Sequence, residues 1–298
     1  MTYTCGFRLQ AEGAIVLLAA VGVMLVCQPA AAQGNGHGNA YGHYKSTVAA
    51  STHVGSNGTP IPGTGVVNFG SWLDDASLQD AGRGFVTMGF GLFKTPVYRE
   101  VDLPTIDSGF AVNRRLQVGM TVPYYYASAP GDPGARGFGD VYLNAKYQLR
   151  APTPHRAGFA IIPMVEVLSV APPSGGSRVQ WALPASVERQ FSGWRAMGTG
   201  GYFSRGAVFG AGAVEVKLSR RAYGTGSLSR SYSTHRDELS AALGFHRSRT
   251  DLSGGVSYSV RPDVSVYGNL GRSIFARDNN SASLMASAGV SIGVKRVP

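Results

Sequence analysis

Cysteine is almost absent from this chain, because only Cys5 and Cys27 occur among its 298 residues. Both precede the part that we predict to be the mature protein, so we expect no disulfide, no thiol chemistry and no cysteine-ligated metal there. Charged residues are also scarce, at 15% against about 25% in an average soluble domain. A disordered basic tail or a coiled coil would carry more charge, so both classes are excluded.

Long apolar runs are missing, apart from one near the start. Residues 14–26 read AIVLLAAVGVMLV, and three alanines follow at 30–32. A helical membrane protein needs several runs of about 20 apolar residues, so that class is excluded. An apolar stretch followed by small residues is typical of a secretory signal, and we predict that residues 1–32 are a signal peptide cut after Ala32. A membrane anchor and a lipoprotein signal at Cys27 are the alternatives.

Glycine, in contrast, is abundant, with 41 residues against a usual share of about 7%. It does not recur at every third position, which excludes collagen. Residues 33–81 combine Gly with Asn, Ser and Thr and begin without visible periodicity. We predict that residues 33–81 form a flexible segment, which serves as a plug or as a tether for the domain after it.

From residue 82 onward, apolar residues alternate with small or polar ones, which is the period of a β-strand. In the clearest run, Val141, Leu143, Ala145, Tyr147 and Leu149 alternate with Asp140, Tyr142, Asn144, Lys146 and Gln148. Turn signals such as Asn113-Arg114-Arg115 and Arg261-Pro262-Asp263 separate the runs. The pattern therefore predicts an all-β domain over residues 82–298.

The polar face of these strands favours a transmembrane barrel over a soluble sandwich. It carries mainly Gly, Ser, Thr, Asn and Tyr, which suits a lumen with lipid on the other side of the wall. Because backbone groups in lipid must all be paired, we predict a closed antiparallel up-and-down barrel. Aromatic residues near strand ends are expected to form girdles at the membrane surfaces: Tyr124, Tyr125, Tyr126, Trp181, Trp194, Tyr202 and Phe203.

The number of strands is ambiguous in the sequence. Thirteen candidates lie between residues 84 and 294, whereas a bacterial single-chain barrel has an even number. Merging two neighbouring candidates between residues 191 and 260 gives twelve strands, the number that we prefer. This stretch includes a candidate at 237–246. Adding residues 66–73 as a further strand gives fourteen.

One run resembles a known family. Residues 137–147, GFGDVYLNAKY, resemble the G-x-G-D-x-x-x-x-x-K segment of a family of bacterial outer-membrane proteins labelled after the meta-pathway of phenol degradation. Residues 122–124, 200–203, 255–258 and 267–272 look similar as well, so the resemblance covers about residues 72–298. It implies a barrel of about twelve strands and passage of small, often aromatic or apolar, compounds across the outer membrane.

Along each strand, every second side chain is expected to face the lumen. The polar side chains at these positions, which alternate with the apolar ones, are the candidates for a solute pathway. They are Asp140, Tyr142, Asn144, Lys146, Glu166, Glu188, Glu215 and Lys217. A purely structural set of salt bridges is the alternative, because buried charges need partners or water. Asp140 and Lys146 lie about 20 Å apart along one strand, so we expect each to find its partner on another strand.

The function expected from these features is passive passage of small, aromatic or apolar, solutes through a polar lumen. A structural or surface-interaction barrel with a plugged lumen is the alternative. A lipid-modifying enzyme, with His155 or His246 as its base, is less favoured, because no G-x-S-x-G motif occurs. We therefore predict no enzyme activity, no catalytic residue, no cofactor and no metal site.

Basic residues outnumber acidic ones and give the chain a formal net charge of +10, which indicates the kinds of partner that it can bind. Arginines at strand ends and loops suit contact with outer-membrane lipid and lipopolysaccharide. Nucleic acid is not expected, because no basic helix or stacking motif occurs. Further expected partners are the outer-membrane insertion machinery and a small-molecule solute, and the expected location is the bacterial outer membrane after removal of the signal peptide.

Overall fold

The computed structural model describes most of the chain from residue 73 onward. The described residues are 51–52, 60–61, 73–96, 99–128, 135–167, 177–204, 206–234, 246–275, 278 and 281–295. The predicted signal peptide and most of the predicted segment 33–81, including the candidate strand at 66–73 except for its last residue, lie outside these ranges. No helix that is long and apolar enough to cross a membrane occurs among the described residues.

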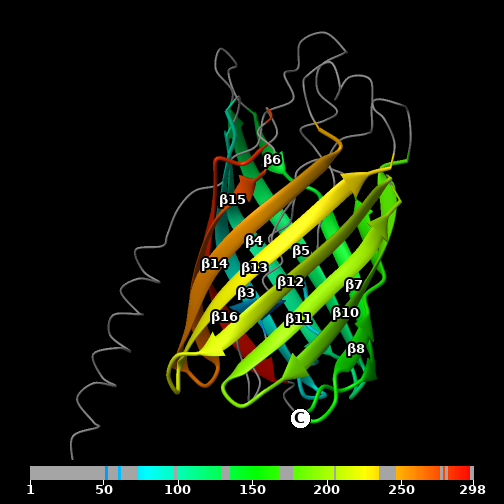
Figure 1. The fold of residues 1–298 in the computed structure, drawn as a ribbon, viewed down its shortest axis with the longest axis vertical. Coiled ribbons are helices and arrows are strands. Elements are labelled where there is room, and N and C mark those ends of the chain that lie inside the picture. Colours follow the sequence, from blue (N-terminus) through cyan, green and yellow to red (C-terminus); the bar gives the residue numbers. More distant parts are fainter. Residues whose placement is uncertain are drawn as a thin grey trace, which may run out of the picture.

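The wall of the molecule is a closed antiparallel barrel of twelve strands, which confirms the predicted fold class and strand number (Figure 1). Its strands are β3 (Arg83–Lys94), β4 (Arg99–Ala111), β5 (Leu116–Ser128), β6 (Ala135–Phe138), β7 (Val141–Arg150), β8 (Gly158–Ile161), β9 (Met164–Val167), β10 (Val179–Gln190), β11 (Trp194–Phe203), β12 (Ala207–Lys217), β13 (Ala222–Ser233), β14 (Ser248–Arg261), β15 (Val264–Ile274) and β16 (Leu284–Lys295). Two short strands, β1 (Ser51–Thr52) and β2 (Pro60–Ile61), pair with each other apart from the wall.

Two positions in the wall are each filled by two short strands. β6 and β7 both pair with β5, and β8 and β9 both pair with β10. The breaks fall at Gly139-Asp140 and at Ile162-Pro163, and proline cannot donate a ladder hydrogen bond. Pairing of β16 with β3, from Leu284 opposite Lys94 to Lys295 opposite Arg83, closes the ring.

β13 pairs directly with β14, which resolves the ambiguity in strand number. The register runs from Ala222 opposite Tyr258 to Tyr232 opposite Ser248 and leaves no place in the wall for a strand between the two. The candidate at 237–246 is therefore the surplus one, and the expectation that two candidates would merge was wrong. Residues 237–245 themselves lie outside the described ranges.

The two ends of the barrel differ in the length of their connections. One end, called here the short-turn end, carries the turns at residues 112–115, 151–157, 191–193, 218–221 and 262–263. In the first of these turns, Asn113 Oδ1 accepts hydrogen bonds from the backbone N–H groups of Arg115 and Leu116. In the third, Gly193 has a φ of 89°, a value that glycine adopts without strain. The strands at this end are thus joined by turns whose residues suit them.

Polarity across the wall is inverted relative to a soluble protein. On β3, Thr87 is 1% exposed and points inward, whereas its neighbours Val86 and Met88 are 43% and 62% exposed. The same alternation buries Asp107, Thr121, Ser186, Ser227, Ser253, Ser287 and Ser291, and it exposes Ile106, Met120, Val187, Val214, Leu228, Leu252 and Val290. Apolar side chains outside and polar ones inside are what a barrel in lipid requires.

Aromatic side chains gather at both ends of the wall. Near the end opposite the short turns, the ring of Trp181 lies 5.8 Å from that of Tyr202. At the short-turn end, Phe191 and Trp194 stack with ring centroids 3.9 Å apart. These positions fit girdles at two membrane surfaces. The girdle prediction was wrong for Tyr125 and Phe203. The alternation of side chains along their strands places both inside the barrel, where they are 7% and 2% exposed.

Inside the wall, glycines make room for a large side chain. Tyr267 is 4% exposed, and a Cβ atom at Gly89 or Gly289 would lie 2.8 or 2.7 Å from its hydroxyl oxygen. The ring of Tyr267 therefore occupies the space that side chains at these two positions would fill. In contrast, a Cβ atom at Gly210 would meet nothing within 4 Å.

Candidate functional site

The chain just before the first barrel strand lies inside the barrel. Residues 73–82, called here the lumen segment, contact inward-facing side chains of β5, β7, β10 and β11. Leu73, Asp74, Asp75 and Ala76 are each at most 5% exposed. Gly82 then donates a backbone hydrogen bond to Ala111 at the end of β4. The segment thus runs from within the barrel to its short-turn end, where β3 begins.

Lys146 on β7 is the first ionic anchor of the lumen segment. Its ammonium lies 2.7 Å from Asp74 Oδ1 and 3.0 Å from Asp75 Oδ1, and it donates a third hydrogen bond of 3.2 Å to the backbone oxygen of Ser77. The Lys146 side chain is 2% exposed. An ammonium has three donors, and all three are directed at the segment.

Arg195 on β11 is the second anchor, and it ties the segment to the wall on two sides. Its Nη1 lies 3.0 Å from Asp75 Oδ2 and 3.4 Å from Glu188 Oε1 of β10. Its Nε and Nη2 donate to the two carboxylate oxygens of Glu215 on β12, at 2.8 and 3.2 Å. Asp75 is therefore held by two cations, Lys146 and Arg195. The two-point contact of Arg195 with Glu215 is the stronger form of ion pair.

Further hydrogen bonds hold the backbone and Ser77 of the lumen segment. Thr199 Oγ1 on β11 accepts from the N–H of Asp74 at 3.0 Å and donates to the carbonyl of the same residue at 2.7 Å. Gln148 donates to the carbonyl of Ala76 at 2.7 Å, and Ser77 donates to Glu188 Oε2 at 2.7 Å. Buried backbone groups of an irregular segment need such partners.

Apolar contact makes a smaller contribution to the position of the lumen segment. Leu73 is fully buried and packs against Met197 of β11 and Ala213 of β12. Burying one leucine side chain contributes about 1.5 to 3 kcal/mol. The segment is therefore held mainly by ion pairs and hydrogen bonds, with one apolar contact at its inner end.

The structure places the predicted pathway residues on the inner face of the wall. Six of them are buried, namely Asp140, Tyr142, Lys146, Glu166, Glu188 and Glu215, while Asn144 is half-buried and Lys217 is exposed at the short-turn end. Lys146, Glu188 and Glu215 come together around the lumen segment. Tyr142 and Glu166 form a separate pair, joined by a 2.6 Å hydrogen bond. A role in solute passage stays a prediction for all eight.

Sequence reasoning missed the partners of these charges. Lys146 does not pair with another strand, as we expected, but with Asp74 and Asp75 of the lumen segment. Arg195 was not among the predicted site residues. It lies two and four positions before the inward-facing Met197 and Thr199 on β11, and alternate positions of a strand share a face. That alternation is the signal that could have identified it.

A second group of charges lies away from the lumen segment, near the end opposite the short turns. Arg249 Nε lies 3.0 Å from both carboxylate oxygens of Asp251 on the same strand. Ser273 of β15 donates to Asp251 Oδ1 at 2.6 Å, and the Arg249 guanidinium lies 4.7 Å from the centre of the Phe93 ring. These contacts join β14, β15 and β3 and suit a structural role.

The two candidate bases of the disfavoured enzyme hypothesis lie at opposite ends of the barrel. His155 belongs to the turn between β7 and β8 at the short-turn end. His246 precedes β14 at the other end, where its backbone N–H donates to Asp278. The two histidines therefore do not share one site. Among the described residues, no group of three or more His, Cys, Asp or Glu side chains is arranged to hold a metal ion.

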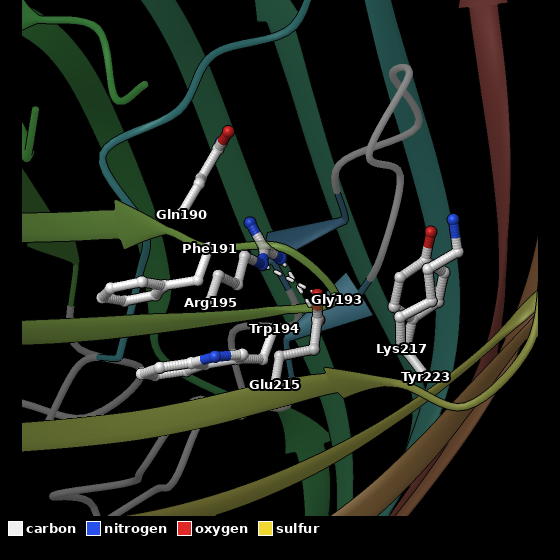
Figure 2. A pocket seen from close by; sticks show the side chains of 8 residues that line it. All are labelled: Gln190, Phe191, Gly193, Trp194, Arg195, Glu215, Lys217 and Tyr223. Carbon is white, nitrogen blue, oxygen red and sulfur yellow. Dashed lines mark hydrogen bonds and ion pairs between the residues drawn. The ribbon is translucent and has the colours of Figure 1, made fainter. Parts of the chain in front are cut away.

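A pocket of about 190 Å³ opens beside the Arg195–Glu215 pair, at the short-turn end (Figure 2). It is lined by Gln190, Phe191, Gly193, Trp194, Arg195, Glu215, Lys217 and Tyr223. We call it the mouth pocket. Figure 2 shows the side chains of Lys217 and Tyr223 next to each other, with the ammonium and the phenol oxygen pointing the same way.

Comparison with known proteins bears on the fold. No protein-family model and no curated protein matches this chain. Among solved structures, the chain is similar to the NanC porin, with a TM-score of 0.52 and 10% identity over 70% of this chain and 98% of that one. It is also similar to an outer-membrane channel from Pseudomonas putida F1, with a TM-score of 0.57 and 9% identity over 74% of this chain and 98% of that one. At such identities, the similarity shows a shared barrel fold.

Proposed function

We propose that this chain is an outer-membrane channel that gives small solutes passive passage, and that the lumen segment closes its short-turn end. The observation that carries the proposal is the ionic attachment of Asp74 and Asp75 to Lys146 and Arg195 inside a wall of inverted polarity. Similarity in fold to the NanC porin and to the Pseudomonas putida channel supports a role in passage. The longest connections, at residues 168–178, 234–247 and 275–283, all lie at the end opposite the short turns. This suits an outside end there and a periplasmic short-turn end.

The kind of attachment favours a closure that can be released. A segment fixed by an apolar core would need a large surface exposed to water before it could move. The lumen segment is instead fixed by ion pairs and hydrogen bonds, with Leu73 as its buried apolar contact. Water and ions entering the lumen can replace such contacts one at a time, because the net free energy of a hydrogen bond is about 0.5 to 1.5 kcal/mol, or about 1.5 to 3 kcal/mol where a partner is charged.

A structural barrel with a permanently filled lumen is the second candidate function. The buried ion pairs favour it, because both bases of the group, Lys146 and Arg195, are already paired with acids of the chain and need no solute. The two candidates predict different results once the ion pairs are weakened. A channel then opens, whereas a structural barrel stays impermeable or unfolds.

Single-channel recording of the refolded chain in planar bilayers tests the proposal. The variant Asp74→Asn/Asp75→Asn keeps side-chain shape and hydrogen-bonding capacity but removes both carboxylate charges that face Lys146 and Arg195. We expect stable ohmic steps several-fold larger than those of the unmodified chain. Asp80→Asn is the matched control, because Asp80 is 71% exposed and its ion-pair partner in the described part of the chain is Arg83, at 3.4 Å.

Two results would contradict the proposal. If the double variant is folded and as silent as the unmodified chain, the lumen is permanently filled and the barrel is structural. If Asp80→Asn raises the conductance as much as the double variant, the ion pairs inside the lumen are not what closes it. The sequence resemblance adds small aromatic or apolar compounds as solutes for later uptake assays.

A further inference from the structure

We propose that the mouth pocket binds the carboxylate of a small organic acid through Lys217 and Tyr223. The inference deepens the proposed function by naming a solute class for the same lumen. Lys217 is the last residue of β12 and Tyr223 is its direct partner on β13. Because paired residues of adjacent strands share a face, their side chains lie next to each other at the mouth (Figure 2).

The donors of Lys217 and Tyr223 are available for a ligand. Within the described ranges, neither the ammonium of Lys217 nor the hydroxyl of Tyr223 takes part in an ion pair or a hydrogen bond. Lys217 is exposed and Tyr223 is half-buried, so a molecule at the short-turn end can reach both. A carboxylate has two oxygens that each accept hydrogen bonds, which matches one ammonium and one phenol side by side.

The charges that line the mouth pocket favour an anion. Glu215 accepts hydrogen bonds from both Nε and Nη2 of Arg195, which also pairs with Asp75 and Glu188, so Glu215 and Arg195 are both engaged within the protein. Lys217 then remains as the uncompensated charge among the lining residues. Charge-assisted hydrogen bonds are about twice as strong as neutral ones, so a carboxylate gains more here than an amide or an alcohol.

The lumen already shows how it holds carboxylates. Asp75 of the lumen segment is bound by Lys146 and Arg195, at 3.0 Å from each. Lys146, Arg195 and Lys217 all point inward, from β7, β11 and β12, respectively. Two of these three cations therefore carry a carboxylate of the chain itself, and the third, at the mouth, has space beside it. A solute carboxylate at Lys217 would make the same kind of contact.

An aromatic ring beside the cation favours an acid with a small apolar body. Phe191, Trp194 and Tyr223 belong to the lining of the mouth pocket. The ring of Tyr223 lies beside Lys217, whereas Phe191 and Trp194 stack on each other at the other side of the pocket lining, with their rings turned away from Lys217 (Figure 2). The suitable probe is therefore a carboxylate on a single ring, and 4-fluorobenzoate offers a fluorine signal for binding measurements.

Fluorine NMR of 4-fluorobenzoate with the full chain refolded in a zwitterionic detergent tests the inference. The neutral analogue 4-fluorobenzamide reports binding by the apolar ring alone. We expect the benzoate to bind at least about tenfold more tightly than the benzamide, and Lys217→Met to weaken it by about tenfold or more. Tyr223→Phe should weaken it several-fold, whereas Lys217→Arg should retain most of the affinity because it keeps the cation.

Lys94→Met is the matched control, because Lys94 is an exposed lysine at the end of β3 farthest from the short turns. It should leave the affinity for benzoate unchanged. Equal binding of benzoate and benzamide, or unchanged affinity in folded Lys217→Met, would overturn the inference. The measurement does not depend on conduction, so the two proposals can fail separately. A chain that binds benzoate but stays silent as Asp74→Asn/Asp75→Asn refutes only the proposed channel. A chain that conducts as that variant but does not bind benzoate refutes only the carboxylate site.

Discussion

The ammonium of Lys146 lies 2.7 Å from Oδ1 of Asp74, which stands 72 residues earlier in the chain. This contact joins a segment without regular secondary structure to the middle of a barrel strand. Both side chains are at most 7% exposed, so their charges compensate each other in a site with little water. The position of the lumen segment therefore depends on a small number of buried charges.

Replacing Lys146 by methionine should destabilise the barrel. The variant removes from a buried site the cation that Asp74 and Asp75 share, and Arg195 still pairs with Asp75. Removal of one partner of a buried ion pair costs about 3 to 5 kcal/mol, unless the segment leaves the lumen and hydrates its carboxylates. Urea unfolding in lipid vesicles measures the first outcome, and conductance measures the second. If neither stability nor conductance changes, Lys146 does not anchor the segment.

An arginine placed on the lipid-facing side should destabilise the barrel according to its depth. Met88 lies in the middle of β3 and is 62% exposed on the outer face. Met88→Arg should cost about 2 to 4 kcal/mol in the free energy of unfolding in vesicles, as for arginine at the bilayer midplane. Val294→Arg, near the end of β16, should cost about 0 to 1 kcal/mol. Equal effects at both positions would refute the inferred placement of the wall in the membrane.

An alanine at Gly89 should disturb the packing inside the lumen. The added Cβ atom would lie 2.8 Å from the hydroxyl oxygen of Tyr267 and at least 3.6 Å from any other neighbour. Overpacking of this kind costs about 1 to 3 kcal/mol, measured by urea unfolding. Tyr267→Phe removes the clashing atom and should restore most of the loss in the double variant. Gly210→Ala, which meets nothing within 4 Å, should have little effect; a loss as large as that of Gly89→Ala would contradict the account.

Period two in the sequence predicts both the strands and the faces of their side chains. In β7, the sequence alone places Tyr142 and Lys146 on the polar face, and both are 2% exposed inside the barrel. The same parity rule identifies Arg195, once β11 is taken to begin at Trp194. Alternation is a local property of the backbone, so a single strand is enough to reveal it.

Pairing between distant residues is not a local property, and the sequence does not reveal it. The contact of Lys146 with Asp74 depends on barrel closure, on strand register and on the path of a segment that has no period. Asp74 and Asp75, two acids just before the first strand, are the signal that was present in the sequence. Without knowledge of the strand register, these two acids give no reason to prefer Lys146 over another cation as their partner.

A reversible covalent lock on the lumen segment tests the central claim most directly. Leu73 and Ala213 of β12 belong to one buried cluster, so a cysteine at each position is a candidate disulfide between segment and wall. The variant is Leu73→Cys/Ala213→Cys with Asp74→Asn/Asp75→Asn, and Cys5 and Cys27 are replaced by serine. The account predicts single-channel conductance that falls to the level of the unmodified chain on oxidation and returns on reduction. Conductance that is the same in the oxidised and reduced states, with the disulfide confirmed by mass spectrometry, would contradict closure by the lumen segment.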